Sequence, residues 1–100
     1  MKQTTQSICG TSFHDTIITT TLNKLKKVLG EPVCFDNTGE DKVNIEWKLE
    51  TENGKVFTVY DWKEYRPIKP NELIEWHIGG FTLQDTKEAY NEIMDGLNKL

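Results

Sequence analysis

The chain has 100 residues, enough for one compact domain and too few for two. Hydrophobic residues make up 36% and charged residues 28%, so there is enough apolar material for a core and disorder is excluded. The formal net charge of −4 disfavours duplex nucleic-acid binding, which normally needs a surplus of Lys and Arg. We expect residues 1–9, which are polar and aperiodic, to be a flexible N-terminus ahead of a single domain over residues 10–100.

Two cysteines, Cys9 and Cys34, are too few for a disulfide-built scaffold and stand in no metal-ligand spacing. We therefore expect free thiols, no metal and no cofactor. The apolar runs are too short for a secretion leader or a membrane span, so we expect a soluble intracellular protein. Because a domain of this length buries only a thin core, we also expect a homo-oligomer.

The first regular elements lie between residues 16 and 30. β-Branched residues predict a short strand over residues 16–19. Apolar residues at helical spacing then predict a helix from Leu22 to Leu29. Thr20 or Thr21 can cap its start, and Gly30 supplies the left-handed end.

Two strand patterns, over residues 43–51 and 55–63, flank an Asn-Gly dipeptide at 53–54, which is a strong hairpin signal. A two-residue turn at that dipeptide fixes the register of every later cross-strand pair. On the face expected to meet the core, it pairs Leu49 with Thr58, Trp47 with Tyr60 and Ile45 with Trp62.

On the reverse face the same register places Glu46 opposite Asp61, and Lys48 opposite Val59. Two facing carboxylates are unfavourable unless a positive group or a ligand lies near them. The simpler interpretation is a carboxylate held by a neighbouring Lys or Arg. The alternative is a cluster of Glu46, Asp61 and His77 that binds a ligand or a metal, or that works as acid and base.

Residues 64–73 contain two prolines and are expected to form a loop. Residues 74–78 alternate apolar and polar side chains and predict a third antiparallel strand. Gly79 and Gly80 are then expected to turn the chain into a final helix that Thr82 caps. This order predicts an α+β protein, a two-layer β-α-β-β-β-α sandwich whose antiparallel sheet carries both helices on one face.

No Ser, Cys or His stands in a catalytic motif, so we expect no catalytic residue and no enzyme. The glycine turn before Thr82 could bind an anion with its free amides, although Thr82 itself could satisfy them. A nucleotide needs a flat apolar surface and fixed donors, and only this region combines aromatic, cationic and glycine-amide groups. The candidate ligand-binding residues are therefore Asp61, Trp62, Lys63, Arg66, His77, Gly79, Gly80 and Thr82.

Four strings of residues carry a resemblance that spans roughly residues 10–97. They are Gly10-Thr-Ser, Gly30-Glu-Pro, the Trp47…Val59-Tyr-Asp-Trp-Lys63 hairpin and Trp76-His-Ile-Gly-Gly80. With these strings the chain resembles small uncharacterised proteins of tailed bacteriophages.

That resemblance implies an accessory phage protein that acts in the host cytoplasm and suppresses antiviral defence. One such activity is a sponge, which sequesters a nucleotide immune signal such as a cyclic oligonucleotide or a cyclic ADP-ribose derivative. The aromatic residues, the glycine pair and the single Arg favour the sponge. The alternatives are an acidic nucleic-acid mimic that inhibits a host defence protein directly, and a small virion component.

Overall fold

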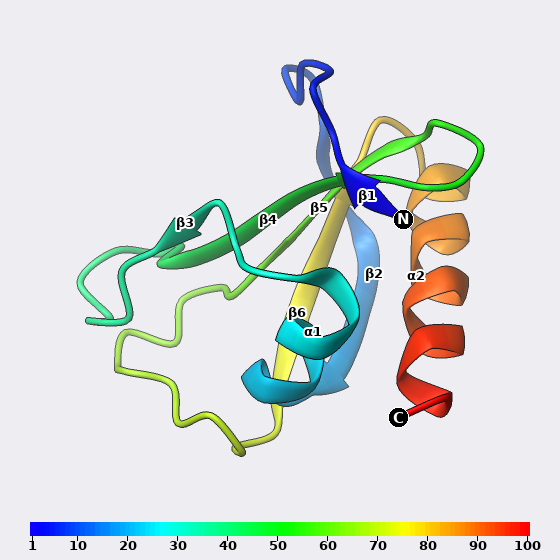
Figure 1. Cartoon of the computed structure of the whole chain (residues 1–100). Helices are drawn as coiled ribbons and strands as arrows, with labels where there is room; N and C mark the ends of the chain where they lie inside the picture. The colour runs from blue at the N-terminus through cyan, green and yellow to red at the C-terminus, as the bar shows by residue number, and fades with distance from the viewer.

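The computed structural model describes all 100 residues as two helices packed on one face of an antiparallel, six-stranded sheet (Figure 1). This confirms the expected α+β class. The elements are β1 (Lys2–Gln3), β2 (Ser12–Thr20), α1 (Leu22–Leu29), β3 (Cys34–Phe35), β4 (Ile45–Glu50), β5 (Val56–Tyr60), β6 (Ile74–Gly80) and α2 (Leu83–Asn98).

The sheet has the order β1-β4-β5-β6-β2, with β3 pairing β4 as well. The two-residue strands β1 and β3 add to the expected β-α-β-β-β-α order. Within the segment expected to be a flexible N-terminus, Lys2 pairs with Glu50 and Gln3 pairs with Leu49. Backbone hydrogen bonds at the open edge of β4 stabilise a segment whose side chains have no periodic pattern.

Both helices begin at the threonines that the sequence offers as caps. The Thr21 hydroxyl accepts a hydrogen bond from the Lys24 amide at 3.1 Å, and the Thr82 hydroxyl accepts one from the Asp85 amide at 3.0 Å. At the end of α1, Gly30 has a φ of 85°, and its amide donates to the Lys26 carbonyl. Neither helix combines the length and the apolar character that crossing a membrane requires.

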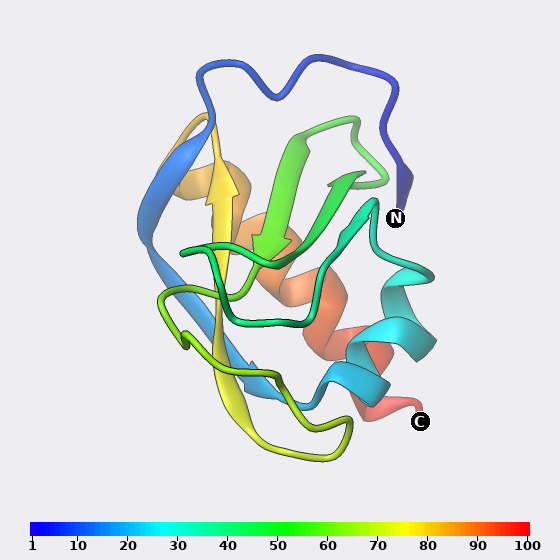
Figure 2. The same ribbon diagram turned by 90° about the vertical axis from the view of Figure 1, so that its left-hand side faces the viewer.

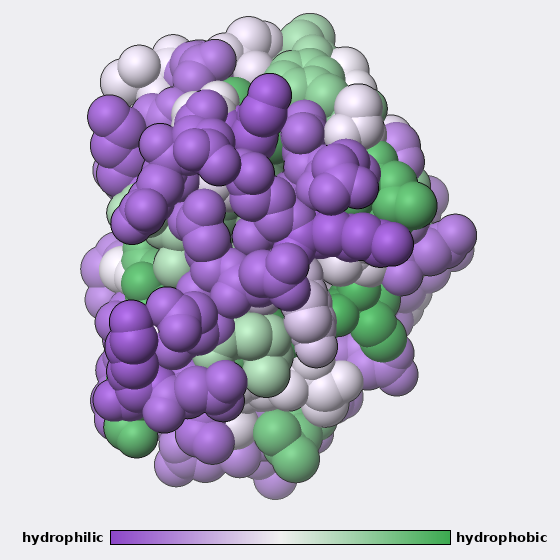
Figure 3. Space-filling view, turned by 90° about the vertical axis from the view of Figure 1, so that its right-hand side faces the viewer, coloured by the Kyte–Doolittle hydropathy of each residue, from purple (hydrophilic) through white to green (hydrophobic).

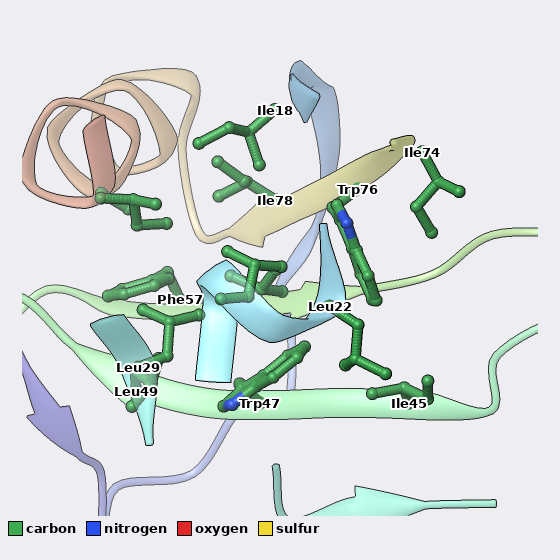
Figure 4. Packing of buried hydrophobic residues seen from close by; sticks show 14 of the residues in the cluster. Ile18, Leu22, Leu29, Ile45, Trp47, Leu49, Phe57, Ile74, Trp76 and Ile78 are labelled. Atoms are coloured by element: carbon green, nitrogen blue, oxygen red, sulfur yellow. The ribbon is translucent and has the colours of Figure 1, made fainter. Parts of the chain in front are cut away.

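The core lies between the sheet and the two helices, and Trp47 and Trp76 are its largest members. Their rings meet edge to face at 5.6 Å on the side of the sheet where α1 lies (Figure 4). Both indoles also donate at the ends of α1, Trp47 to the Gly30 carbonyl at 2.8 Å and Trp76 to the Thr20 carbonyl at 3.1 Å. These bonds fix α1 on the sheet while they satisfy two buried donors.

The second helix covers the rest of the same face through Ala89 and Ile93, which are fully buried. In the side view of Figure 2, α2 lies behind the sheet, α1 lies beside its lower end, and no helix crosses in front of the strands. The outer side of α2 is mostly hydrophilic, as expected for a solvated helix face (Figure 3). The two faces of the sheet therefore have different environments, and only one of them is covered by helices.

The β4–β5 hairpin has a register one residue away from the expected one. Trp47 pairs with Val59 rather than Tyr60, and Lys48 pairs with Thr58 rather than Val59. The turn spans three residues, 52–54, with Gly54 in the left-handed region at φ 79°. The expected pairs of Leu49 with Thr58, Trp47 with Tyr60 and Ile45 with Trp62 are therefore wrong, because the slip moves every β5 side chain to the other face.

Contacts with α2 stabilise the longer turn. The Thr51 hydroxyl donates to Glu88 Oε2 at 2.5 Å, and the Asn53 side-chain amide donates to Glu88 Oε1 at 3.1 Å. The Thr51 amide also donates to the Lys55 carbonyl and closes the loop. A two-residue turn would displace Thr51 from Glu88, so the register depends on a helix that is distant in sequence. Figure 1 shows this turn beside the first turns of α2.

The shifted register places Asp61 on the helix-covered side, where it is fully buried. Its Oδ1 accepts hydrogen bonds from the backbone amides of Asn44 at 2.8 Å and Ile45 at 2.9 Å. The Asn44 side-chain amide reaches its Oδ2 at 3.5 Å. The expected opposition of Glu46 and Asp61 is therefore wrong, since Glu46 pairs with Tyr60 and Asp61 lies on the other face.

Substitution of Asp61 by Ala should lower the free energy of unfolding by about 2–4 kcal/mol, because two buried amides lose their acceptor. Urea denaturation followed by circular dichroism measures the loss. Asp41→Ala, at an exposed carboxylate, is the matched control and should stay within about 0.5 kcal/mol of wild type. Equal stabilities of the two variants would contradict a structural role for Asp61.

Candidate functional site

The uncovered face of the sheet carries a row of side chains that crosses four strands. Glu46 on β4 pairs with Tyr60 on β5, Tyr60 pairs with His77 on β6, and His77 pairs with Ile17 on β2. Because their neighbours in each strand point into the core, these four side chains point away from the helices. Figure 2 looks onto this face.

Four rings gather on that row and form what we call the aromatic cluster: Phe13, Tyr60, Trp62 and His77. The imidazole of His77 stacks on Phe13 at 3.9 Å between ring centroids and on Trp62 at 5.8 Å, with interplanar angles of 15° and 26°. Tyr60 contacts both His77 at 5.5 Å and Trp62 at 6.3 Å. Phe13 and Trp62 remain 37% and 39% exposed, so the cluster presents ring surface to solvent.

An irregularity in β2 brings Phe13 onto His77. Phe13 pairs with Gly79 and Ile17 pairs with His77, so β2 has two residues more than β6 between these pairs. Asp15, inside this bulge, has a φ of 65°. Left-handed backbone at a residue other than glycine costs about 1–2 kcal/mol and is often found at functional sites.

Lys63 is a second strained position beside the cluster, with a φ of 54°. Its Nζ lies 5.4 Å from the Trp62 ring centroid, within cation–π range, and makes no ion pair. A cation without a counter-ion therefore lies next to the most exposed indole. This neighbourhood suits an anionic group attached to a stacked ring.

The opposite end of the row is acidic and partly desolvated. Burial raises the pKa of the Glu46 carboxyl above its ordinary value; Lys48 opposes that shift, and the charge of Asp61 adds to it. Burial also raises the pKa of the Tyr60 phenol, with a further contribution from Glu46. The cross-strand row therefore has a hydrogen-bond acceptor, Glu46, at one end and the flat rings of the aromatic cluster beside it.

Of the predicted ligand-binding residues, Trp62, Lys63 and His77 lie together at the cluster. Asp61 lies on the other face, buried against backbone amides, and is not open to a ligand. Arg66 pairs with Glu72 at 2.6 Å within its own loop, and this hydrogen bond raises the pKa of Arg66. Arg66 makes no ring contact with the cluster.

The expected glycine turn is wrong, because Gly79 and Gly80 are paired residues of β6. Gly79 pairs with Thr58 and Phe13, and Gly80 pairs with Phe57 and Ser12. Thr82 lies outside the strand and caps α2 with its own hydroxyl.

The two glycines serve close packing. A Cβ at Gly79 would lie 2.6 Å from Thr58 Oγ1 and 3.5 Å from Tyr60 Cε1, and one at Gly80 would lie 2.9 Å from Thr86 Cγ2. Gly79 therefore makes room beneath the aromatic cluster, and Gly80 lets α2 approach the sheet.

The structure does not bring Glu46, Asp61 and His77 together as the cluster that the sequence left open. Glu46 and His77 share the face without Asp61, and no group of three metal-ligating side chains is present. Ser12 Oγ lies 3.3 Å from His14 Nε2, but that nitrogen also lies 3.1 Å from the Gly80 carbonyl. A carbonyl only accepts, so Nε2 carries the proton and cannot deprotonate Ser12.

Sequence reasoning missed Phe13 and misplaced Tyr60. Phe13 precedes the segment predicted as a strand, and the residue types around it do not predict a bulge. The assignment of Tyr60 to the core followed directly from the shorter turn. The alternation of Tyr60 and Trp62 with buried Val59 and Asp61 was a usable signal once the register was known.

We compared the chain with family models, with curated proteins and with solved structures, and none of these comparisons gave a match.

The His77 imidazole should make the stability depend on pH. Burial lowers its pKa below the ordinary 6.5, and Glu75 opposes the shift. The unfolded chain therefore binds the proton more readily, so stability is lost as the pH falls from 6.5 through the lowered pKa. NMR titration of the imidazole measures the pKa, and His77→Gln should flatten the pH dependence of unfolding in that window. A pKa at or above 6.5 would contradict burial in the cluster.

Proposed function

We propose that this chain is a phage accessory protein, without catalytic activity, that binds a nucleotide immune signal on its uncovered sheet face and so sequesters it from the host. A cyclic oligonucleotide or a cyclic ADP-ribose derivative has the required chemistry. The phage setting, the host cytoplasm and the role against antiviral defence rest on the sequence resemblance. The binding chemistry rests on the aromatic cluster.

The exposed, near-parallel stack of Phe13, His77 and Trp62 is the observation that carries this proposal. Aromatic side chains on an open sheet face are a common platform for nucleobases, and each stacked base contributes about 1–3 kcal/mol. A ring that serves only stability is normally covered, as Trp47 and Trp76 are. The exposed faces of Phe13 and Trp62 thus leave room for a base.

Lys63 supplies the second part of the recognition. Its ammonium lies over Trp62 and is free of ion pairs, so it can meet the phosphate of a nucleotide whose base stacks on that indole. One cation beside an aromatic surface matches a small nucleotide. It does not match a long duplex, which calls for many basic groups.

Trp62→Ala should weaken nucleotide binding by about 10-fold or more, because one stacking surface is lost. The melting temperature should change little, since the side chain is 39% exposed. Titration calorimetry with cyclic dinucleotides, cyclic ADP-ribose and nucleoside monophosphates measures the affinity. Quenching of indole fluorescence reports the same event, because Trp62 is the exposed tryptophan and the other two are buried.

Phe35→Ala is the matched control, since Phe35 is a 50% exposed ring on β3 that lies under Lys26 rather than in the cluster. It should bind as wild type does. Absence of binding by wild type to every nucleotide would contradict the proposal. Loss of binding to a host protein on charge reversal at Glu40 or Asp41 would then support the acidic-mimic alternative.

A homo-oligomer forms part of the same proposal. The single chain has no enclosed pocket, whereas tight small-molecule sites bury most of their ligand. A base on the aromatic cluster would be covered by this chain on one side only. A second copy placed over that face would cover the other side and bury Phe13, Ile17 and Trp62, which are the exposed apolar groups there.

Light scattering should accordingly give a mass above 11.6 kDa at micromolar concentration, and the fraction of oligomer should rise when nucleotide is added. Phe13→Asp should return the protein to the monomer, because it places a charge in the covered surface. A mass of 11.6 kDa for wild type with and without nucleotide would contradict the oligomer.

A further inference from the structure

Glu46 is the charged side chain of the cross-strand row. It pairs with Tyr60, whose ring contacts both His77 and Trp62. It points to the uncovered face because Ile45 and Trp47, its neighbours in β4, are fully buried in the core. The carboxylate thus stands at the edge of the surface on which a base would stack.

The Glu46 carboxylate has no partner within the chain. It makes no ion pair, and no hydrogen bond contributes to its environment. Glu50, four residues along the same strand and on the same face, is by contrast bound by Gln6 at 2.7 Å and Lys2 at 3.8 Å. A half-buried carboxylate without hydrogen-bond donors loses hydration, and the attraction of Lys48 offsets only part of that loss. A ligand that brings donors would supply the missing hydrogen bonds.

We infer that the Glu46 carboxylate accepts hydrogen bonds from the edge of the stacked base and that the preferred ligand is a guanine nucleotide. A carboxylate only accepts hydrogen bonds, and it accepts two in parallel from adjacent donors. Guanine presents two such donors side by side on its Watson–Crick edge, N1–H and the N2 amino group. Adenine, cytosine and uracil each present at most one donor position there, next to an acceptor.

The sheet geometry brings the base edge and the carboxylate together. In the observed register Trp62 lies two residues beyond Tyr60, so it is diagonal to Glu46 across β4 and β5. Diagonal neighbours are roughly 7–8 Å apart, a span that a base stacked on Trp62 can bridge. Lys63, whose Nζ lies 5.4 Å from the centroid of the same indole, remains free for the phosphate.

This inference rests on the proposed nucleotide binding, and one titration series separates the two. We would measure the affinities of GMP, IMP, AMP, CMP and UMP for wild type, Glu46→Gln and Glu75→Gln. IMP retains N1–H and lacks the N2 amino group, so it isolates one of the two donors. Glu75 is the matched control, because it is an exposed glutamate on β6 that points to the same face.

Wild type should bind GMP about 10-fold more tightly than AMP, CMP or UMP, with IMP between them. Glu46→Gln should bind all five within about 2-fold of one another, at the wild-type affinity for AMP, while Glu75→Gln keeps the preference. Equal affinities for GMP and AMP in wild type, or a preference that persists in Glu46→Gln, would overturn guanine recognition and leave nucleotide binding standing. Failure of all five nucleotides to bind wild type would overturn both.

Discussion

The buried carboxylate of Asp61 helps to hold the β4–β5 register, on which the solvent-facing side chains at the end of β5 depend. It accepts hydrogen bonds from the backbone amides of Asn44 and Ile45 at the start of β4. Alternation along the strand then places Tyr60 and Trp62 on the uncovered face. A slip of one residue would bury those two rings and expose Asp61, so the aromatic cluster depends on this register.

The two faces of the sheet use aromatic side chains in different ways. Trp47 and Trp76 are buried, meet edge to face, and donate to carbonyls at the two ends of α1. The rings of the aromatic cluster contact one another, but no helix covers them. Two residues with strained, left-handed backbone, Asp15 and Lys63, lie beside the cluster. Strain and exposed apolar surface both reduce stability, and their coincidence at one place is more typical of a binding surface than of a scaffold.

Local rules predicted much of this fold. The caps at Thr21 and Thr82, the end of α1 at Gly30 and the third long strand all follow from side chains near in sequence. The hairpin register does not, because a three-residue turn is selected by Glu88 on α2. The strands β1 and β3, at two residues each, are too short to show a period.

The candidate site was harder to predict than the fold. Trp62, Lys63 and His77 are aromatic or cationic, as a nucleotide site requires, and they do lie together. Asp61 and the glycine pair were predicted as site residues because neither the hairpin register nor the end of β6 follows from the sequence. The place of Phe13 depends on the bulge between Phe13 and Ile17, and Glu46 separates from Asp61 only in the observed register. Long-range pairing, which sequence patterns express poorly, decides all of these placements.

NMR mapping of a bound nucleotide on isotopically labelled protein tests the central claim most directly. If the uncovered sheet face is the binding surface, GMP should shift the ring and side-chain resonances of Phe13, Glu46, Tyr60, Trp62 and His77, while the indole signals of Trp47 and Trp76 and the amides around Thr82 stay in place. Shifts confined to the start of α2 or to the outer face of that helix, with the aromatic cluster unchanged, would contradict the account.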